Sequence, residues 1–175
     1  FGVVLIERGS EVGGGDVRFA VGTVARIVSV EVSEGSIHLL ANGATRFEVL
    51  RWLQDDPFPR AEVRELAAVE FDGSTPEALA EVEALVRGTL ARASEFVELP
   101  WPADVELSPE LGDRIWQVAG IAPLSSIDQY ALLCSTTASE LLTRLVDETQ
   151  GAEIVLTAGW GSGSADGGGG EGAAG

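Results

Sequence analysis

The side chains that could carry out chemistry are few in this sequence. His38 is the only histidine, and Cys134 is the only cysteine. His38 alternates with apolar residues of a predicted strand, which is typical of a solvated or structural histidine. Cys134 has no neighbouring His or Lys to activate it, so we expect an inert core thiol. One His and one Cys with no ligand spacing predict no metal site.

Known catalytic motifs are also missing. The cluster Gly13-Gly14-Gly15 lacks the spacing and the following Lys of a phosphate-binding loop, so we expect a loop between strands. The Ser-containing residues 159–164 have no strand–helix context for a nucleophile. Asp55 and Asp56 stand in a turn, where solvation explains them. We predict a protein that is not an enzyme and uses no cofactor. An enzyme with an unrecognised carboxylate site stays open as an alternative.

Charge narrows the choice of partners. The 11 basic residues are all Arg, and against 28 acidic residues they give a net charge of −17. Such acidity disfavours nucleic acid as a partner. No apolar run reaches the roughly 18 residues of a membrane span, so we expect no membrane partner. A single cysteine excludes an intrachain disulfide, and we expect a cytoplasmic location.

Residues 1–72 have the pattern of β-structure. Residues 21–32 are rich in β-branched side chains and predict a strand with an apolar face of Val24, Val28, Val30 and Val32. Ser33–Ser36 predicts a hairpin turn, and Asn42-Gly43 predicts a second turn. Strands follow at 46–53 and 61–71. Consecutive short strands with tight turns indicate an antiparallel meander or a small barrel.

Residues 73–150 have the pattern of a small helical bundle. Thr75 and Pro76 predict the start of a helix. Its apolar stripe consists of Leu79, Val82, Val86, Leu90, Ala93 and Val97. Shorter helices are predicted from Ser108, Ser126 and Thr137. Residues 151–175, rich in Gly, Ser and Ala, predict a disordered tail.

Several short motifs then occur in one order along the chain. They are "GT-apolar-A" at 22–25, "G-x-x-R-F-x-V" at 43–49, "A-E-V" at 61–63, "L-x-D" at 111–113, Gln-Tyr-Ala-Leu-Leu at 129–133 and "x-R-L" at 143–145. In this order and spacing the chain resembles the substrate-binding domain found at the N-terminus of Lon protease, in a stand-alone bacterial form. The likeness covers roughly residues 1–150.

The resemblance implies an α+β fold: an antiparallel PUA-like β pseudo-barrel followed by a small helical bundle. It implies a non-catalytic recognition module for unfolded or apolar polypeptide, with polypeptide clients or a protease or chaperone as partners. A Lon-type Ser–Lys dyad is impossible in a chain without Lys. The family's Pro-rich opening strands are absent before Phe1. We therefore expect a truncated chain that exposes a sheet edge, is marginally stable and self-associates.

Apolar residues in irregular segments are the candidates for partner binding: Trp52, Phe58 and Trp101. The alternative is that these residues cover the core or the junction between barrel and bundle. A second alternative is small-ligand binding in a PUA-like aromatic pocket, for which Trp52 and Trp101 would have to converge.

Overall fold

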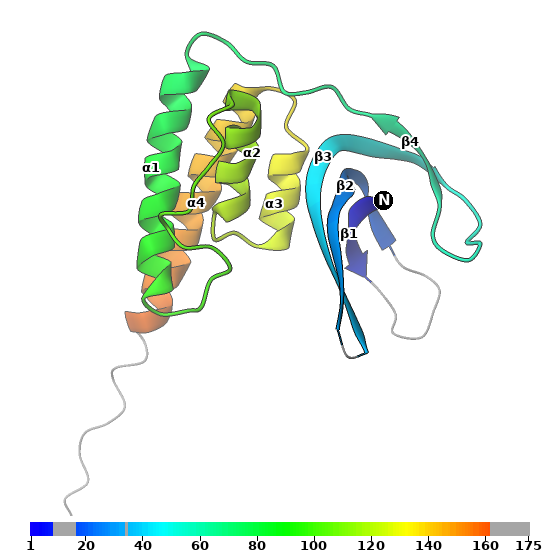
Figure 1. Ribbon diagram of the computed structural model, residues 1–175. Coiled ribbons are helices and arrows are strands. Elements are labelled where there is room, and N and C mark those ends of the chain that lie inside the picture. The colour runs from blue at the N-terminus through cyan, green and yellow to red at the C-terminus, as the bar shows by residue number, and fades with distance from the viewer. Residues whose placement is uncertain (9–16, 34, 162–175) are drawn as a thin grey trace, which may run out of the picture. The chain divides into compact units, whose positions relative to one another are not determined.

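The chain folds into two compact units in a computed structural model that describes residues 1–8, 17–33 and 35–161 (Figure 1). Unit 1 comprises Phe1–Asp72 and Ser126–Leu141, and unit 2 comprises Gly73–Ser125 and Leu142–Gly175. The predicted loop at 13–15 lies outside the described residues. Within these residues, no helix combines the length and the hydropathy needed to cross a membrane.

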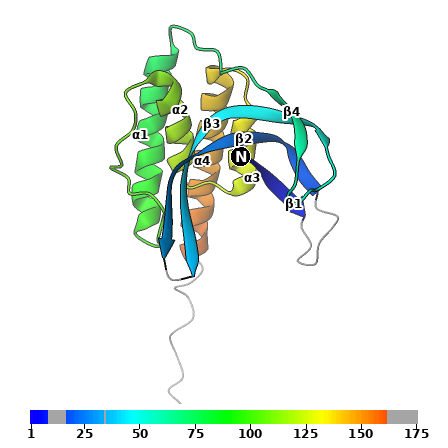
Figure 2. The same ribbon diagram turned by 45° about the vertical axis from the view of Figure 1, so that its right-hand side comes forward.

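Unit 1 is built on an antiparallel sheet with the strand order β1-β2-β3-β4. The strands are β1 (Gly2–Arg8), β2 (Val17–Ser33), β3 (Ser36–Trp52) and β4 (Ala61–Glu65). The turn between β2 and β3 forms where Ser33–Ser36 predicted it, and Gly35 takes a positive φ of 84°. β2 and β3 are long and strongly bent (Figures 1 and 2). The predicted α+β class is confirmed. The described sheet is open, with β1 and β4 at its edges.

The second predicted turn, at Asn42-Gly43, is wrong. β3 runs through these residues without a break. Gly43 pairs with Ala25 and Arg46 pairs with Thr23, so two residues of β3 face one residue of β2. This is a β-bulge, which bends the strand and increases its twist. The glycine therefore marks a bend in one long strand and not the end of a strand.

The two faces of the sheet have different surroundings, because successive side chains of a strand point to opposite faces. Gly22 and Phe47 are paired across β2 and β3, so both face the same side of the sheet, and the Phe47 side chain is buried there. Helix α3 (Ser126–Leu133) packs on the other face. There the rings of Phe19 and Tyr130 lie 4.3 Å apart between centroids. This ring pair ties a helix far along the chain to the sheet.

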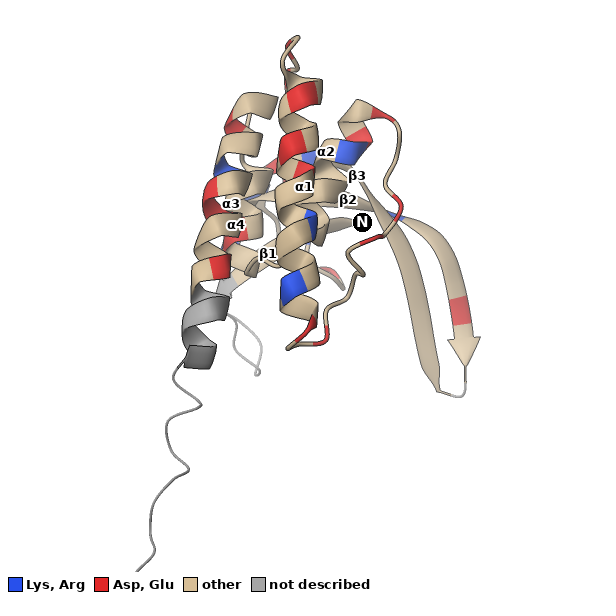
Figure 3. Ribbon diagram, turned by 90° about the vertical axis from the view of Figure 1, so that its left-hand side faces the viewer, with Lys and Arg blue, Asp and Glu red and all other residues tan. Residues whose placement is uncertain are grey.

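Beyond the end of β1, the β2–β3 hairpin continues as a two-stranded ribbon, which we name the hairpin arm (residues 25–33 and 35–45). Of the predicted apolar face, Val28, Val30 and Val32 lie on the arm and are exposed, whereas Val24 lies before the arm and is half-buried. A register shift between Ile27 and Ser29 interrupts the alternation, so the four residues do not form the single face that was predicted. The arm's large apolar side chains are Ile27, Val28, Val30, Val32, Ile37, Leu39 and Leu40. Figure 3 shows that the arm carries little charge, whereas α1 carries both acidic and basic residues. The arm is therefore an apolar extension of the sheet.

Unit 2 consists of α1 (Thr75–Ser94), α2 (Leu111–Ile121) and the part of α4 (Ala138–Gly161) that follows Leu141. The predicted stripe of α1 is buried from Leu79 to Ala93. Val97, predicted as its last member, lies beyond the end of the helix and is exposed. Other buried apolar residues of this unit lie on α2 and α4: Ile115, Val118, Ala119, Ile121, Leu142 and Leu145.

The predicted domain limits need two corrections. The boundary at 72/73 agrees with the division into units, but α3 and the first turn of α4 group with the sheet, so one bundle over 73–150 is wrong. They group with the sheet because β3 and the segment after β4 form hydrogen bonds with α3 and the residues that follow it.

The second correction concerns the tail. Helix α4 continues to Gly161, so the predicted tail is wrong for residues 151–161. Glu153 pairs with Arg92 at 2.8 Å, which favours a helix here despite the glycines. Residues 162–175 lie outside the described residues.

Candidate binding site

A cavity of about 250 Å³ opens on the face of the sheet that carries Phe47. We name it the sheet cavity. All four strands and the loop before β4 contribute to its lining, which consists of Gly2, Val4, Val24, Phe47, Val49, Trp52, Pro59, Ala61 and Val63. The curvature of β2 and β3 explains why both edge strands reach one cavity. The bulge at Ala44–Thr45 contributes to this curvature.

The lining of the sheet cavity contains no ionisable side chain. Acid–base and nucleophilic catalysis need such groups within hydrogen-bonding reach of the reacting atoms. In the part of the chain that the structure describes, no cluster of His, Cys, Asp and Glu could hold a metal ion. The chemistry that this cavity offers is burial of apolar surface.

Trp52, one of the predicted binding residues, lies at the rim of this cavity and is 38% exposed. The guanidinium carbon of Arg18 lies 4.5 Å from the centroid of the Trp52 ring. A cation over an aromatic face is an attractive contact, and it fixes the plane of the ring. Trp52 is therefore a partly exposed aromatic surface held in one orientation.

The other two predicted binding residues do not line the sheet cavity. Phe58 lies in the loop between β3 and β4, after the cis bond Asp56-Pro57, and is 61% exposed. Trp101 is half exposed and belongs to unit 2, between α1 and α2. The aromatic side chains that the cavity combines are Phe47 and Trp52. The convergence of Trp52 and Trp101 that the aromatic-pocket alternative requires is thus not a feature of this cavity.

A second hollow, which we name the α3 groove, lies on the opposite face of the sheet. It measures about 350 Å³ and is lined by Val3, Val4, Leu5, Val21, Thr23, Ser126, Gln129, Tyr130 and Leu133. Burial raises the pKa of the Tyr130 hydroxyl, and the neighbouring Cys134 raises it further. Tyr130 is therefore a neutral hydroxyl here and not a base at neutral pH.

Arg46 is the residue that joins the sheet to the segment after α3. Its guanidinium donates hydrogen bonds to the carbonyl oxygens of Leu133 at 2.8 Å, Ser135 at 2.5 Å and Ala67 at 2.8 Å. Burial lowers the pKa of Arg46, which nevertheless stays charged at neutral pH. The planar fork of Arg suits three carbonyls at once. The backbone of Glu70 also bonds to Thr136 and Ala138 nearby.

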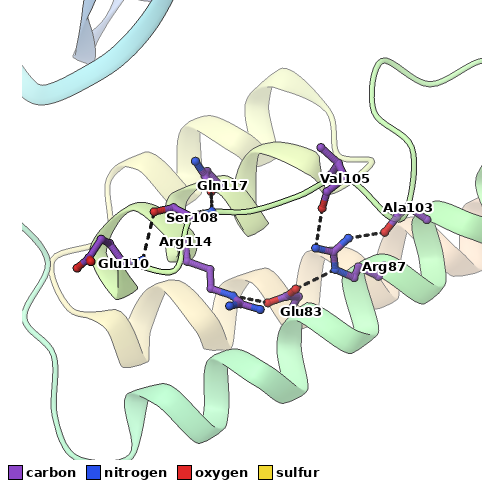
Figure 4. Close-up of polar contacts among 8 residues, drawn as sticks. All are labelled: Glu83, Arg87, Ala103, Val105, Ser108, Glu110, Arg114 and Gln117. Carbon is purple, nitrogen blue, oxygen red and sulfur yellow. Dashed lines mark hydrogen bonds and ion pairs between the residues drawn. The ribbon is translucent and has the colours of Figure 1, made fainter.

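Unit 2 has its own ionic cluster, centred on the buried Glu83 of α1, with the partly exposed Arg87 and Arg114 around it (Figure 4). Arg87 and Arg114 each donate to one oxygen of Glu83 at 2.8 Å. Arg87 also donates to the carbonyl oxygens of Ala103 and Val105. The hydrogen bond from Arg114 is the main cause that lowers the pKa of Glu83, and burial opposes it. A carboxylate held ionised by two arginines stabilises the α1–α2 loop and is unsuited to act as a base.

The remaining sequence candidates have ordinary positions. His38 is exposed on β3 opposite Glu31. Asp55 and Asp56 are exposed in the loop after β3. Cys134 follows the last residue of α3 and is exposed, so the expected core thiol is wrong. It is wrong because the helix ends one residue earlier and Leu132 occupies the buried position.

Several residues that shape the site were not singled out from the sequence. Gly2 and Gly22 are small enough to let the Phe47 ring lie over the sheet: a Cβ at Gly2 would lie 2.9 Å from the ring. Arg46 was noted only as part of a motif. The strand pattern gave no signal for this contact, because β3 also carries Arg51, which is exposed and pairs with Glu62.

Comparison with known proteins gives a consistent set of matches. A family model described as "ATP-dependent protease La (LON) substrate-binding domain" matches residues 1–150. "Lon protease" of Rhizobium meliloti (strain 1021) is 28% identical over 133 residues. That match covers 75% of this chain and 14% of the protease, so the chain spans a small part of that relative's length.

Two solved structures match this chain. The N-terminal domain of Mycobacterium avium complex Lon protease has a TM-score of 0.53 and 21% identity, with 86% of this chain and 90% of that chain covered. A Lon N-terminal domain protein from Xanthomonas campestris has a TM-score of 0.49 and 21% identity, with 75% and 69% covered. At this identity the first of these likenesses concerns the fold alone.

Proposed function

Because the chain belongs to the Lon substrate-binding domain family, we propose that it is a non-catalytic recognition module that binds unfolded or apolar segments of polypeptides. The observation that carries the proposal is the sheet cavity, which is open and has a wholly non-ionisable lining. Apolar side chains that are exposed only in unfolded proteins are the ligands such a lining favours.

The proposal includes the absence of ATPase and protease activity in this chain. The sequence has no Lys, so neither a phosphate-binding Lys nor a Ser–Lys dyad can form. In the proposed role the chain delivers or holds a client for a protease or chaperone partner. We place it in the cytoplasm, which the lack of any intrachain disulfide supports.

We also propose weak self-association through the edge of the sheet. β1 is an edge strand, and its residues from Gly2 to Ile6 are uncharged. Uncharged edges are prone to pair with further strands. The net charge of −17 opposes contact between copies.

Binding to a permanently unfolded protein tests the proposed function directly. The probe is reduced, carboxyamidomethylated lysozyme, and native lysozyme is the matched control of the same composition and nearly the same basic charge. We expect binding of the unfolded form in isothermal titration, with a negative heat-capacity change from apolar burial, and no binding of the native form. Equal binding of both forms would show simple charge attraction and would refute the proposal.

One observation favours a second candidate, a small aromatic or aliphatic ligand. Phe47 and Trp52 both line the sheet cavity. At about 250 Å³ the cavity falls below the roughly 300–1,000 Å³ of pockets for drug-sized ligands. Only a compact ligand would fit, and it would compete with the unfolded protein for the same cavity. Titration with indole alone tests this candidate: heat of binding from indole, with none from unfolded lysozyme, would favour the small ligand over the polypeptide, and no heat from indole would refute the small-ligand candidate.

A further inference from the structure

Trp101 lies in the loop between α1 and α2, which hydrogen bonds hold in one conformation. Arg87 of α1 donates to the carbonyl oxygens of Ala103 and of Val105, the latter at 2.9 Å. The N–H of Val105 donates to the carbonyl oxygen of Pro102 at 3.2 Å. A loop fixed in this way presents its side chains from an ordered backbone.

The indole of Trp101 is an exposed aromatic surface on this loop, with an exposed fraction of 48%. Pro100 and Pro102 flank it in the sequence, and a proline fixes its own φ and restricts the residue before it. A ligand that binds to Trp101 therefore has to order little of the loop. Residues 73–125 are described without a gap, so no undescribed segment adjoins the loop along the chain.

Trp101 differs from Trp52 in what covers its ring. The guanidinium of Arg18 lies over the Trp52 ring, with its carbon atom 4.5 Å from the centroid. In the part of the chain that the structure describes, Trp101 has no such contact. Trp is the side chain whose ring attracts a cation most strongly. The half-exposed ring of Trp101 is therefore open to a cation from another molecule.

The loop is acidic on both sides of Trp101. Residues 95–110 contain five acidic residues and no Arg, Lys or His. Glu98 and Asp104 are exposed and each lie three residues from Trp101, so their Cα atoms are within about 11 Å of its Cα atom. The Debye length is about 10 Å in 0.1 M salt, so their charges act on a cation over the ring.

The basic residues of the neighbouring helices do not cancel this field. Arg87 and Arg114 share the carboxylate of Glu83, each at 2.8 Å. Arg92 pairs with Glu153 at 2.8 Å. The one positive charge that these pairs leave over is outnumbered by the five carboxylates of the loop. Charge and ring together favour a cationic ligand.

We propose that Trp101 binds an arginine or lysine side chain of an unfolded client, with the cation over the indole ring and the carboxylates of Glu98 and Asp104 attracting it. A second copy of this chain is disfavoured as the ligand, because it has the same net charge of −17 and no Lys. This inference rests on the proposed function in taking the ligand to be a polypeptide. It deepens that function by adding a site on unit 2 and a preference for basic segments.

Binding of a short basic peptide tests this. The probe is rhodamine-labelled Gly-Arg-Ser-Arg-Gly in 0.1 M sodium chloride, and the matched control replaces both Arg by citrulline, which has nearly the same shape and no charge. We expect fluorescence anisotropy to show about tenfold weaker binding of the citrulline peptide. Trp101→Leu should weaken binding of the Arg peptide by roughly threefold or more. Phe71→Leu changes an exposed aromatic outside the loop and should leave binding unchanged.

The indole N–H signals in nuclear magnetic resonance spectra locate the site. The chain has four Trp, and the signal lost in Trp101→Phe is that of Trp101. We expect the Arg peptide to shift this signal more than the other three. A shift confined to the Trp52 signal would overturn the proposal. A Trp101 signal that moves with protein concentration in the absence of peptide would assign the ring to a contact between copies, and would overturn it as well.

The role of the carboxylates needs a separate control. Glu98→Gln combined with Asp104→Asn should weaken binding of the Arg peptide by roughly threefold. Glu77→Gln combined with Glu81→Gln removes the same charge from exposed positions of α1, roughly 20 Å or more from the loop along the helix axis, and should have little effect. Equal losses in the two double variants would show that only the overall charge matters and would refute the site.

Two further outcomes bear on the cation itself. Equal binding of the Arg and citrulline peptides would refute recognition of a cation. If Trp101→Leu does not fold, the citrulline peptide and the indole signals of the parent chain still decide the question.

The unfolded lysozyme titration separates this inference from the proposed function. Unfolded lysozyme that binds equally well to the parent chain and to Trp101→Leu, while the Arg peptide does not bind, would overturn the inference and leave polypeptide recognition standing. An Arg peptide that binds at Trp101 while unfolded lysozyme does not bind would refute the proposed function and support the cation site alone. No binding of either would refute both.

Discussion

Arg46 connects parts of unit 1 that are far apart in the sequence. Its three hydrogen bonds reach carbonyls at the end of α3, just after α3 and after β4. We expect Arg46→Lys to lower the free energy of unfolding by about 2 kcal/mol, because a lysine cannot reach all three carbonyls and leaves partly buried acceptors without donors. Urea denaturation followed by circular dichroism measures this. The control is Arg51→Lys, whose ion pair with Glu62 is exposed and should matter by less than about 1 kcal/mol.

Glu83 gives unit 2 a defined dependence on pH. Its pKa is lowered from the usual 4.5, so it binds a proton less readily in the folded chain than in the unfolded chain. The resulting stability is present above pH 4.5 and is lost as the pH falls through the folded pKa. We expect Glu83→Gln to cost about 2 kcal/mol at pH 7 and progressively less below pH 4.5.

Glu81→Gln is the matched control for this pH dependence, because it removes the same charge from an exposed position of α1. Its effect should be small at all pH values. A difference between Glu83→Gln and the parent chain that grows as the pH falls would contradict the assignment of Glu83 as a carboxylate held ionised by Arg87 and Arg114.

Close contact between β1 and β2 depends on the small size of Gly22. An added Cβ would overlap the carbonyl oxygen of Val3 and would lie 2.7 Å from the Phe47 ring. We expect Gly22→Ala to destabilise unit 1 by about 1–3 kcal/mol through overpacking. Thermal unfolding followed by circular dichroism is the measurement. Gly43→Ala is the control, since its Cβ would meet only the Thr23 methyl group at 3.4 Å. Similar losses in both variants would indicate general loss of strand propensity and not a local clash.

Some helices, strands and turns could be predicted from the sequence, and others could not. The stripe of Leu79, Val82 and Val86 predicted α1 because it repeats with the period of a helix over many turns. The Asn42-Gly43 pair gave a wrong prediction because the same residues favour both a turn and a bulge. The pairing of Gly43 with Ala25 across the sheet decides in favour of the bulge. Trp52 was singled out as a candidate for partner binding, and this role stays a prediction, although the residue borders the sheet cavity. The cavity it borders was not predicted, since the bending of β2 and β3 that closes it is a property of paired strands.

The whole molecule combines a high net charge with an uncharged sheet edge and an exposed hairpin arm. Salt screens the repulsion between copies and leaves apolar contact intact. We therefore expect the mean mass in analytical ultracentrifugation to rise with sodium chloride and with protein concentration. Ile6→Lys, which places a charge on β1, should suppress the increase. A mass independent of salt and of this substitution would contradict self-association through β1.

The order of the strands in the sheet also affects the order in which the chain folds. Each pairing in the sheet joins strands that follow one another in the chain, and such contacts close short loops at a low cost in entropy. The bond from Arg46 to Leu133 spans 87 residues and closes a far longer loop. The meander should therefore form before the segment after α3 docks onto it. In stopped-flow experiments, Arg46→Lys should speed unfolding and leave the refolding rate almost unchanged.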